Sequence, residues 1–184
     1  MMNSEFLPEF KRRTEEHWRQ HSINPNIYGF QFQTGTCWNA GLSDEQILAY
    51  ENAVCIRFPS DFKAFLRAMN GSDLPTLNVY GSSGEPLREW IGVYSFPRDI
   101  AHVQLLISEV NADREKLVAT LADQGFILAV TAALMPIYSH RFVVCDDDPK
   151  SSVVLSIADP EDAIVYGNSL HEYLEVEFLK EYRD

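Results

Sequence analysis

The stretch from Leu42 to Gly71 reads LSDEQILAYENAVCIRFPSDFKAFLRAMNG and contains the clearest structural signals of the chain. Ser43 and Gln46 form an S-x-x-Q pattern, which is typical of a capping box at the start of a helix. Pro59 ends this helix, because the residue before a proline avoids the helical region. The pattern therefore predicts an amphipathic helix whose inward positions include Ile47, Tyr50 and Val54.

A second amphipathic helix is predicted directly after Pro59. Ser60 is a candidate N-terminal cap, and Gly71 stands where a left-handed C-terminal cap is favoured. The inward positions are Phe62, Phe65, Leu66 and Met69, at i, i+3, i+4 and i+7, and the positions expected to face outward are Asp61, Lys63 and Arg67. Two capped helices joined at Phe58-Pro59 are thus expected to build the core.

Toward the N-terminus, residues 4–20 predict a helix on the outside of the domain. Asn24-Pro25-Asn26 ends that helix. Aromatic and polar residues then alternate from Tyr28 to Trp38, which predicts a half-buried strand or an extended arm. We therefore divide the chain into an N-terminal helix and arm, residues 1–37, and a main domain, residues 38–184.

The part of the chain after Gly71 predicts short strands and further helices. Residues 72–92 are rich in Gly, Ser and Pro and are expected to be rich in loops. The predicted elements are strands at Leu77–Tyr80 and Trp90–Tyr94, helices at Asp99–Leu106 and Asn111–Leu121, strands at Phe126–Val130, Phe142–Cys145, Val153–Ile157 and Ile164–Tyr166, and a terminal helix from Leu170. This order is typical of a single α+β domain with a mostly antiparallel sheet, which helices cover on one face.

The overall composition, with 184 residues of which 46% are apolar and 23% charged, is that of an ordinary globular protein. No apolar run approaches the roughly 18 residues that span a bilayer, and the charged start lacks the apolar middle of a signal peptide. We therefore expect a cytoplasmic protein that does not bind membranes. Cys37, Cys55 and Cys145 are odd in number and far apart, which predicts reduced, partly buried thiols.

The formal charge of −12 is unevenly distributed. Residues 1–41 carry four acidic and four basic residues, whereas residues 140–184 carry eleven acidic and four basic residues. Direct nucleic-acid binding is disfavoured because it depends on Lys and Arg, and a basic protein partner is favoured because opposite charges steer association. The alternative interpretation is that the charge only keeps the protein soluble. The local acidic groups of the second half are Asp146, Asp147, Asp148, Asp159, Glu161 and Asp162.

Three local patterns could hold a phosphate or a metal, and each lacks part of what such a site needs. Gly81-Ser82-Ser83-Gly84 has the glycines of a phosphate-binding loop but no lysine at the required spacing. His17 and His21 are one helical turn apart without an indicated third ligand, so solvent-facing histidines are the simpler interpretation. Asp146-Asp147-Asp148 lacks the spaced ligands of a calcium loop and is expected to form a turn. We therefore expect no metal and no cofactor.

The candidate nucleophile and base are Ser139 and His140, with Cys145 nearby. Neighbours on a strand point to opposite faces, so the serine and the histidine are not expected to pair. A nucleophile elbow of the G-x-S-x-G kind is also missing from the sequence. We therefore expect no catalytic residues.

Several separated landmarks of the chain share a common order and spacing. They are Leu42-Ser43, Phe58-Pro59-Ser60-Asp61-Phe62-Lys63-Ala64-Phe65-Leu66 and Asn70-Gly71, then Met135-Pro136-Ile137, His140-Arg141, Val153 to Ile157, Ile164 to Asn168 and the helix from Leu170 to Phe178. In this arrangement the chain resembles the SUKH superfamily, which includes the Smi/Knr cell-wall regulators of fungi. The resemblance covers roughly Trp38 to Tyr182.

The resemblance implies a non-enzymatic protein-binding domain of the SUKH fold, and in particular a bacterial immunity protein. Such proteins look like neutralisers of polymorphic toxins, often nucleases, and the resemblance implies a protein partner and no cofactor. An acidic surface suits a basic toxin, so Asp146, Asp147, Asp148, Asp159, Glu161 and Asp162 become the candidate partner-binding residues. The chain itself is expected to be a monomer or a weak homodimer. The alternative function is that of a regulatory scaffold, as in the fungal branch.

Overall fold

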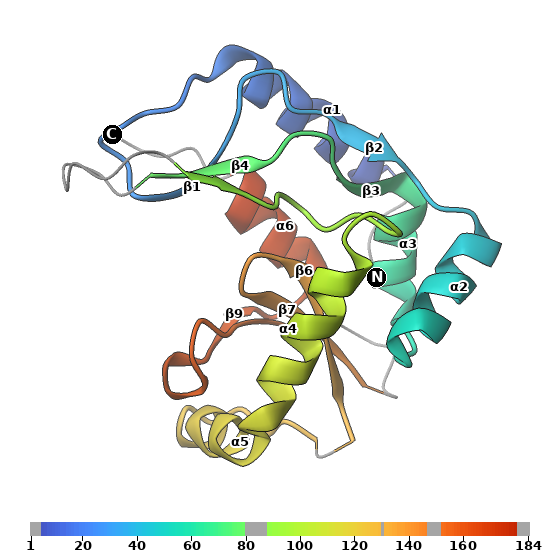
Figure 1. Ribbon diagram of the computed structural model, residues 1–184, viewed down its shortest axis with the longest axis vertical. Helices are drawn as coiled ribbons and strands as arrows, with labels where there is room; N and C mark the ends of the chain where they lie inside the picture. The colour runs from blue at the N-terminus through green and yellow to red at the C-terminus, as the bar shows by residue number, and fades with distance from the viewer. Residues whose placement is uncertain (1–4, 80–87, 130, 147–151, 180–184) are drawn as a thin grey trace.

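The computed structural model describes residues 5–79, 88–129, 131–146 and 152–179. Helices and strands occur in groups along these residues, and Figure 1 shows their arrangement in space. In chain order the elements are α1 (Phe6–Gln20), β1 (Gly29–Phe32), β2 (Trp38–Ala40), α2 (Asp44–Val54), α3 (Ser60–Ala68), β3 (Met69–Ser72), β4 (Thr76–Val79), β5 (Arg88–Trp90), α4 (Ile100–Ala112), α5 (Arg114–Asp123), β6 (Ala133–Tyr138), β7 (Arg141–Cys145), β8 (Val154–Ser156), the 3-10 helix η2 (Pro160–Asp162), β9 (Ile164–Gly167) and α6 (Leu170–Phe178). None of the helices described is long and apolar enough to cross a membrane.

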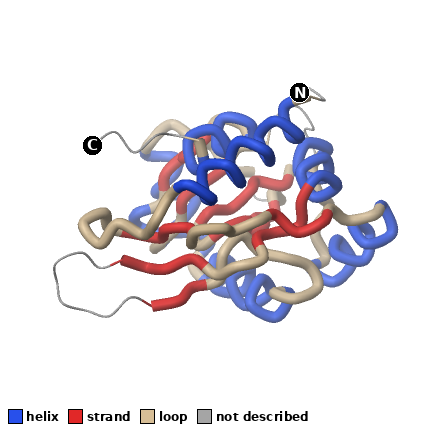
Figure 2. Tube along the Cα trace, turned by 90° about the horizontal axis from the view of Figure 1, so that it is seen from above, coloured by secondary structure: helices blue, strands red, loops and turns tan. Residues whose placement is uncertain are grey.

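The described strands form antiparallel sheets in the orders β1-β4-β5, β2-β3 and β6-β7-β8-β9. The four-stranded sheet is buried on both faces, because its residues alternate between two apolar cores. Met135 and Val143 belong to the main core, with residues of α3 and α6, while Leu134 and Val144 belong to a second core with residues of α4 and α5. Figure 2 shows the strands lying between helices. The predicted α+β class with an antiparallel sheet is confirmed, and helices cover the second face as well.

The predicted capping box at the start of α2 is confirmed. Ser43 Oγ accepts a hydrogen bond from Gln46 N at 3.3 Å, and Gln46 Oε1 accepts one from Ser43 N at 2.8 Å. The predicted cap at α3 is wrong, because the extended residue before that helix is Pro59 and Ser60 is already helical. A proline at this place takes the N-cap position with its fixed φ, so the serine becomes the first helical residue.

Gly71 has the predicted positive φ of 73°, but it does not cap a helix. Helix α3 ends at Ala68, and the chain continues directly into β3, which pairs with β2. A Cβ atom at Gly71 would lie 2.6 Å from the carbonyl oxygen of Val93 and 2.7 Å from that of Tyr94. Glycine is therefore required here by a close backbone approach as well as by its φ.

One edge strand of the main sheet was not predicted. A strand was expected at Phe126–Val130, but residues 126–129 form a loop, and residue 130 lies outside the described residues. The strand is β6 instead, which contains Pro136. Because β6 is the edge of its sheet, the missing N–H of the proline costs little there. The loop at residues 126–129 is apolar because it packs against the protein, with Leu128 buried in the second core, and not because it forms a strand.

Helix α1 lies at the outside of the molecule with one face buried (Figure 1). Phe10 and Trp18 on that face belong to the main core, and Trp38 Nε1 donates a hydrogen bond to Thr14 Oγ1 at 2.7 Å. The predicted arm contains the strand β1, which pairs with β4, and β2 follows directly after the arm and pairs with β3. The N-terminal segment thus packs against the rest of the molecule, and the boundary after residue 37 stays a prediction.

Candidate functional site

The acidic residues predicted to bind a partner do not lie together. They are Asp146, which follows β7, Asp159, Glu161 and Asp162, which lie at η2, and Asp147 and Asp148, which are outside the described residues. Strands β7 and β8 are antiparallel, with Val143 opposite Val154. The chain therefore passes Asp146 at one end of the sheet and enters η2 at the opposite end.

Acidic residues of the α4–α5 segment join the predicted ones at η2. Lys116 of α5 pairs with Glu161, with 2.5 Å between Nζ and Oε1. This hydrogen bond raises the pKa of the Lys116 ammonium, and the charges of Asp159 and Asp113 raise it further. Several carboxylates thus share one lysine, which leaves an excess of negative charge. We call the exposed residues Glu109, Asp113, Asp159, Glu161 and Asp162 the η2 acidic cluster.

A groove of about 330 Å³, here called the α4 groove, opens beside the η2 acidic cluster. Its aromatic lining comes from Phe30, Trp90, Tyr94 and Phe142, and its ionisable lining from His102, His140, Glu109 and Asp113. Trp90 is 44% exposed, although it is a large apolar residue. Tryptophan and tyrosine are enriched in surfaces that bind another protein, and Trp90 is such a residue in an accessible position.

The side chains of Ser139 and His140 also line the α4 groove, and they do form a pair. Ser139 Oγ lies 3.1 Å from His140 Nδ1. The prediction that they point apart is wrong because they occupy the turn between β6 and β7, where Ser139 has a φ of 47°. Burial, and then the charge of Arg141, lower the pKa of His140 to about 4. Among the described residues no carboxylate hydrogen-bonds its ring, so the group that orients the histidine of a catalytic triad is missing from this pair.

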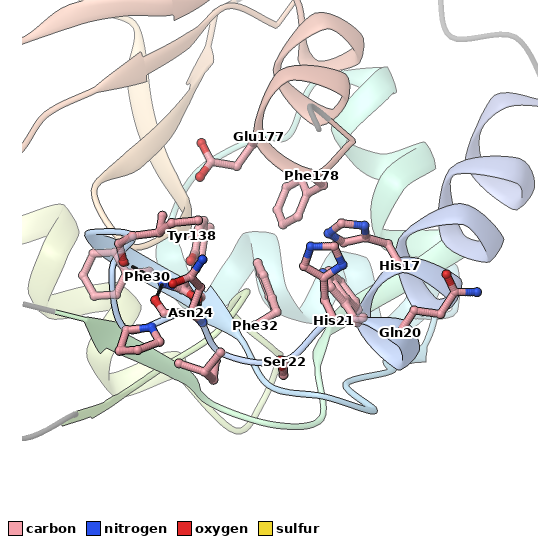
Figure 3. Close-up of a pocket in the computed structure, with 15 residues that line it drawn as sticks. His17, Gln20, His21, Ser22, Asn24, Phe30, Phe32, Tyr138, Glu177 and Phe178 are labelled. Atoms are coloured by element: carbon pink, nitrogen blue, oxygen red, sulfur yellow. Dashed lines mark hydrogen bonds between the residues drawn. The ribbon is translucent and has the colours of Figure 1, made fainter. Parts of the chain in front are cut away.

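A second pocket of about 420 Å³, here called the α1 pocket, lies between the end of α1, β1 and the end of α6 (Figure 3). Figure 3 shows Phe32 and Phe178 between Tyr138 on one side and His17 and His21 on the other. The two histidine rings stack with 4.1 Å between centroids; His21 is exposed as predicted, whereas His17 is partly buried.

Hydrogen bonds and one ion pair hold the walls of the α1 pocket in place. Gln31 Nε2 donates to the carbonyl oxygens of Asn24 at 2.8 Å and Ile27 at 2.6 Å, which fixes the loop after α1. Glu177 lines the pocket, and its Oε2 lies 3.2 Å from Nε of Arg141. Because Arg141 compensates the charge of Glu177, the pocket offers no strong preference for a charged ligand.

The histidines and cysteines of the described residues form no metal site. No group of three His, Cys, Asp or Glu residues among them could hold a metal ion. Cys37 and Cys55 are free and exposed, and Cys145 is free and buried, so the expected partial burial applies to one thiol of the three. Burial raises the pKa of the Cys145 thiol, which disfavours its reactive thiolate form. The predicted loop Gly81-Ser82-Ser83-Gly84 lies outside the described residues.

Comparison with known proteins gives one match. A family model described as the SMI1 / KNR4 family (SUKH-1) matches residues 41–176. Neither the curated proteins nor the solved structures contain a match to this chain. The matched residues include the whole η2 acidic cluster, whereas His17, His21 and Glu177 of the α1 pocket lie outside them.

Proposed function

The chain belongs to the SMI1 / KNR4 family (SUKH-1), and from this membership we propose that it is a non-enzymatic protein-binding domain that acts as a bacterial immunity protein. Its partner is a basic toxin, for which nucleases are the leading class. The toxin binds at the η2 acidic cluster and the adjoining α4 groove, and it needs no cofactor from this protein.

The observation that carries this proposal is the position of the η2 acidic cluster beside an aromatic groove. The cluster has five exposed acidic residues, and Lys116, on whose pKa the charges of Asp113, Asp159 and Glu161 act, is already paired with Glu161. Opposite charge increases the rate at which a basic partner arrives, and a groove with an exposed tryptophan provides apolar contact once it is bound. The negative charge would also occupy the surface that a nuclease uses for phosphates.

Replacing the three acidic residues at η2 is expected to weaken toxin binding. In the variant Asp159→Asn, Glu161→Gln, Asp162→Asn, we expect the dissociation constant to rise about tenfold or more at low salt, with most of the change in the association rate. The partner can be recovered by pull-down from the native cell and identified, and binding can then be measured by surface plasmon resonance at several salt concentrations.

The variant Asp146→Asn, Asp147→Asn, Asp148→Asn is the matched control, because it removes the same charge where the chain leaves β7. Equal losses in both variants would mean that only the net charge acts, and an unchanged affinity and salt dependence in the η2 variant would contradict the proposed surface. Recovery of a cell-wall-assembly protein in place of a toxin would favour the regulatory scaffold.

A further inference from the structure

We propose that the α4 groove is an arginine-binding site, in which a guanidinium of the partner stacks on Trp90 and pairs with Glu109 and Asp113. The inference deepens the proposed function and rests on it for the identity of the partner. The site itself is a feature of this chain and can be tested without the toxin.

The Trp90 ring is held in position while much of it stays open to solvent. Trp90 lies on β5, whose backbone pairs with Thr76 of β4, and the Phe30 ring packs beside it with 5.8 Å between centroids. Trp90 is 44% exposed, whereas Trp18 and Trp38 are 3% and 5% exposed. An aromatic face that is fixed and accessible is the partner that a planar guanidinium prefers.

Two carboxylates at the end of α4 line the same groove. Glu109 lies on α4, Asp113 is the residue directly after its last turn, and both are exposed. The two nearest basic residues of α5 have other partners: Lys116 pairs with Glu161, and Arg114 donates through Nη2 to the carbonyl oxygens of Ala129 and Ala132. The carboxylates of Glu109 and Asp113 thus favour a cationic ligand.

A guanidinium suits this groove better than an ammonium. It carries five N–H donors in a planar fork, which can pair with carboxylates while its face stacks on an aromatic ring. Lysine has a compact ammonium that stacks less well on an aromatic ring, so arginine satisfies the tryptophan and the carboxylates together.

The test uses the full chain and acetyl-arginine amide as the probe. Because Trp90 is the exposed tryptophan, its indole N–H signal in a ¹H–¹⁵N spectrum should shift saturably at millimolar probe, while the indole signals of Trp18 and Trp38 should stay in place. Acetyl-citrulline amide has nearly the same shape without the charge, and it should cause no saturable shift. Acetyl-lysine amide should bind several-fold more weakly than the arginine probe.

In the variant Glu109→Gln, Asp113→Asn, the dissociation constant of acetyl-arginine amide should rise about tenfold, because charge-assisted hydrogen bonds are lost. The control Glu115→Gln, Asp123→Asn removes the same charge from exposed positions of α5 that do not line the groove, and it should have little effect. Absence of a saturable Trp90 shift, equal binding of citrulline, or equal losses in both variants would overturn the proposal. Toxin binding that leaves Trp90 unperturbed would overturn it while the proposed function stands.

Discussion

Gly41→Ala is expected to destabilise the domain strongly, with a loss of about 3 kcal/mol or more in the free energy of unfolding. Gly41 lies against α3, and the neighbouring Leu42 N donates to Leu66 O at 2.8 Å. A Cβ atom at this position would overlap the main-chain carbonyl of Arg67. Because the obstacle is helix backbone rather than a flexible side chain, relief requires α3 to move away from the segment that precedes α2. Urea unfolding at neutral pH measures the loss.

Gly125→Ala is the matched control for this substitution. Gly125 has a φ of 83°, but a Cβ atom there would meet nothing within 4 Å. Its substitution therefore carries only the conformational cost of a left-handed residue, about 1–2 kcal/mol. If Gly41→Ala destabilised the protein no more than Gly125→Ala, the close approach between Gly41 and α3 would be contradicted.

The features that could be predicted from the sequence depend on neighbouring residues. The capping box of Ser43 and Gln46 acts over three residues, so it could be located without knowing the fold. Pro59 does precede α3, but the prediction that it ends α2 is wrong, because α2 ends at Val54 and Cys55 takes a left-handed conformation. Gly71 shows where this stops. Its positive φ could be predicted, but its place in a strand depends on the pairing of β3 with β2, and the space around it is limited by residues 93–95.

The candidate site was only partly predictable for the same reason. Asp146 and Asp159 each follow a predicted strand, so the sequence does not distinguish their positions. The antiparallel pairing of β7 with β8 places them at opposite ends of the sheet. The contribution of Glu109 was missed because the first predicted helix ended at Leu106, whereas α4 continues to Ala112. Asp113 was predicted to lie within the second helix, but it is the residue that joins α4 to α5. The α4 groove combines five separate segments, and no local pattern describes it.

Glu51→Ala is expected to destabilise the protein by about 2–4 kcal/mol, because it leaves a buried donor and a partly buried cation without their acceptor. The Glu51 side chain is only 4% exposed, although it lies on a helix. It accepts hydrogen bonds from Phe58 N at 2.7 Å and from Lys63 Nζ at 2.9 Å. Lys63 and Asp61 were both predicted to face outward. Lys63 instead pairs with the buried Glu51, and Asp61 accepts a hydrogen bond from Ser152 N at 3.2 Å. Glu51 thus links α2, the Phe58-Pro59 connection and α3.

The contribution of Glu51 should also depend on pH. Burial alone raises the pKa of this carboxyl, but the hydrogen bonds from Lys63 and Phe58 N and the charges of Lys63 and Arg57 outweigh burial, so the pKa lies below its ordinary value of 4.5. A carboxyl with a lowered folded-state pKa stabilises the protein above its unfolded-state pKa, and this contribution is lost as the pH falls through the folded-state value. The stability difference between the native protein and Glu51→Gln should therefore be largest above about pH 5 and shrink toward pH 3.

Asp44→Ala provides the control, because Asp44 also forms an ion pair between α2 and α3. Its Oδ1 lies 2.7 Å from Arg67 Nε, but the side chain is 75% exposed. An exposed pair of this kind is worth about 0–1 kcal/mol, so its loss should hardly move the unfolding midpoint. Urea unfolding of the three variants at neutral and acidic pH separates the two pairs. Similar unfolding midpoints for Glu51→Ala and Asp44→Ala would contradict a large contribution of the buried Glu51 carboxylate. The link between α2 and α3 would then depend on apolar contacts alone.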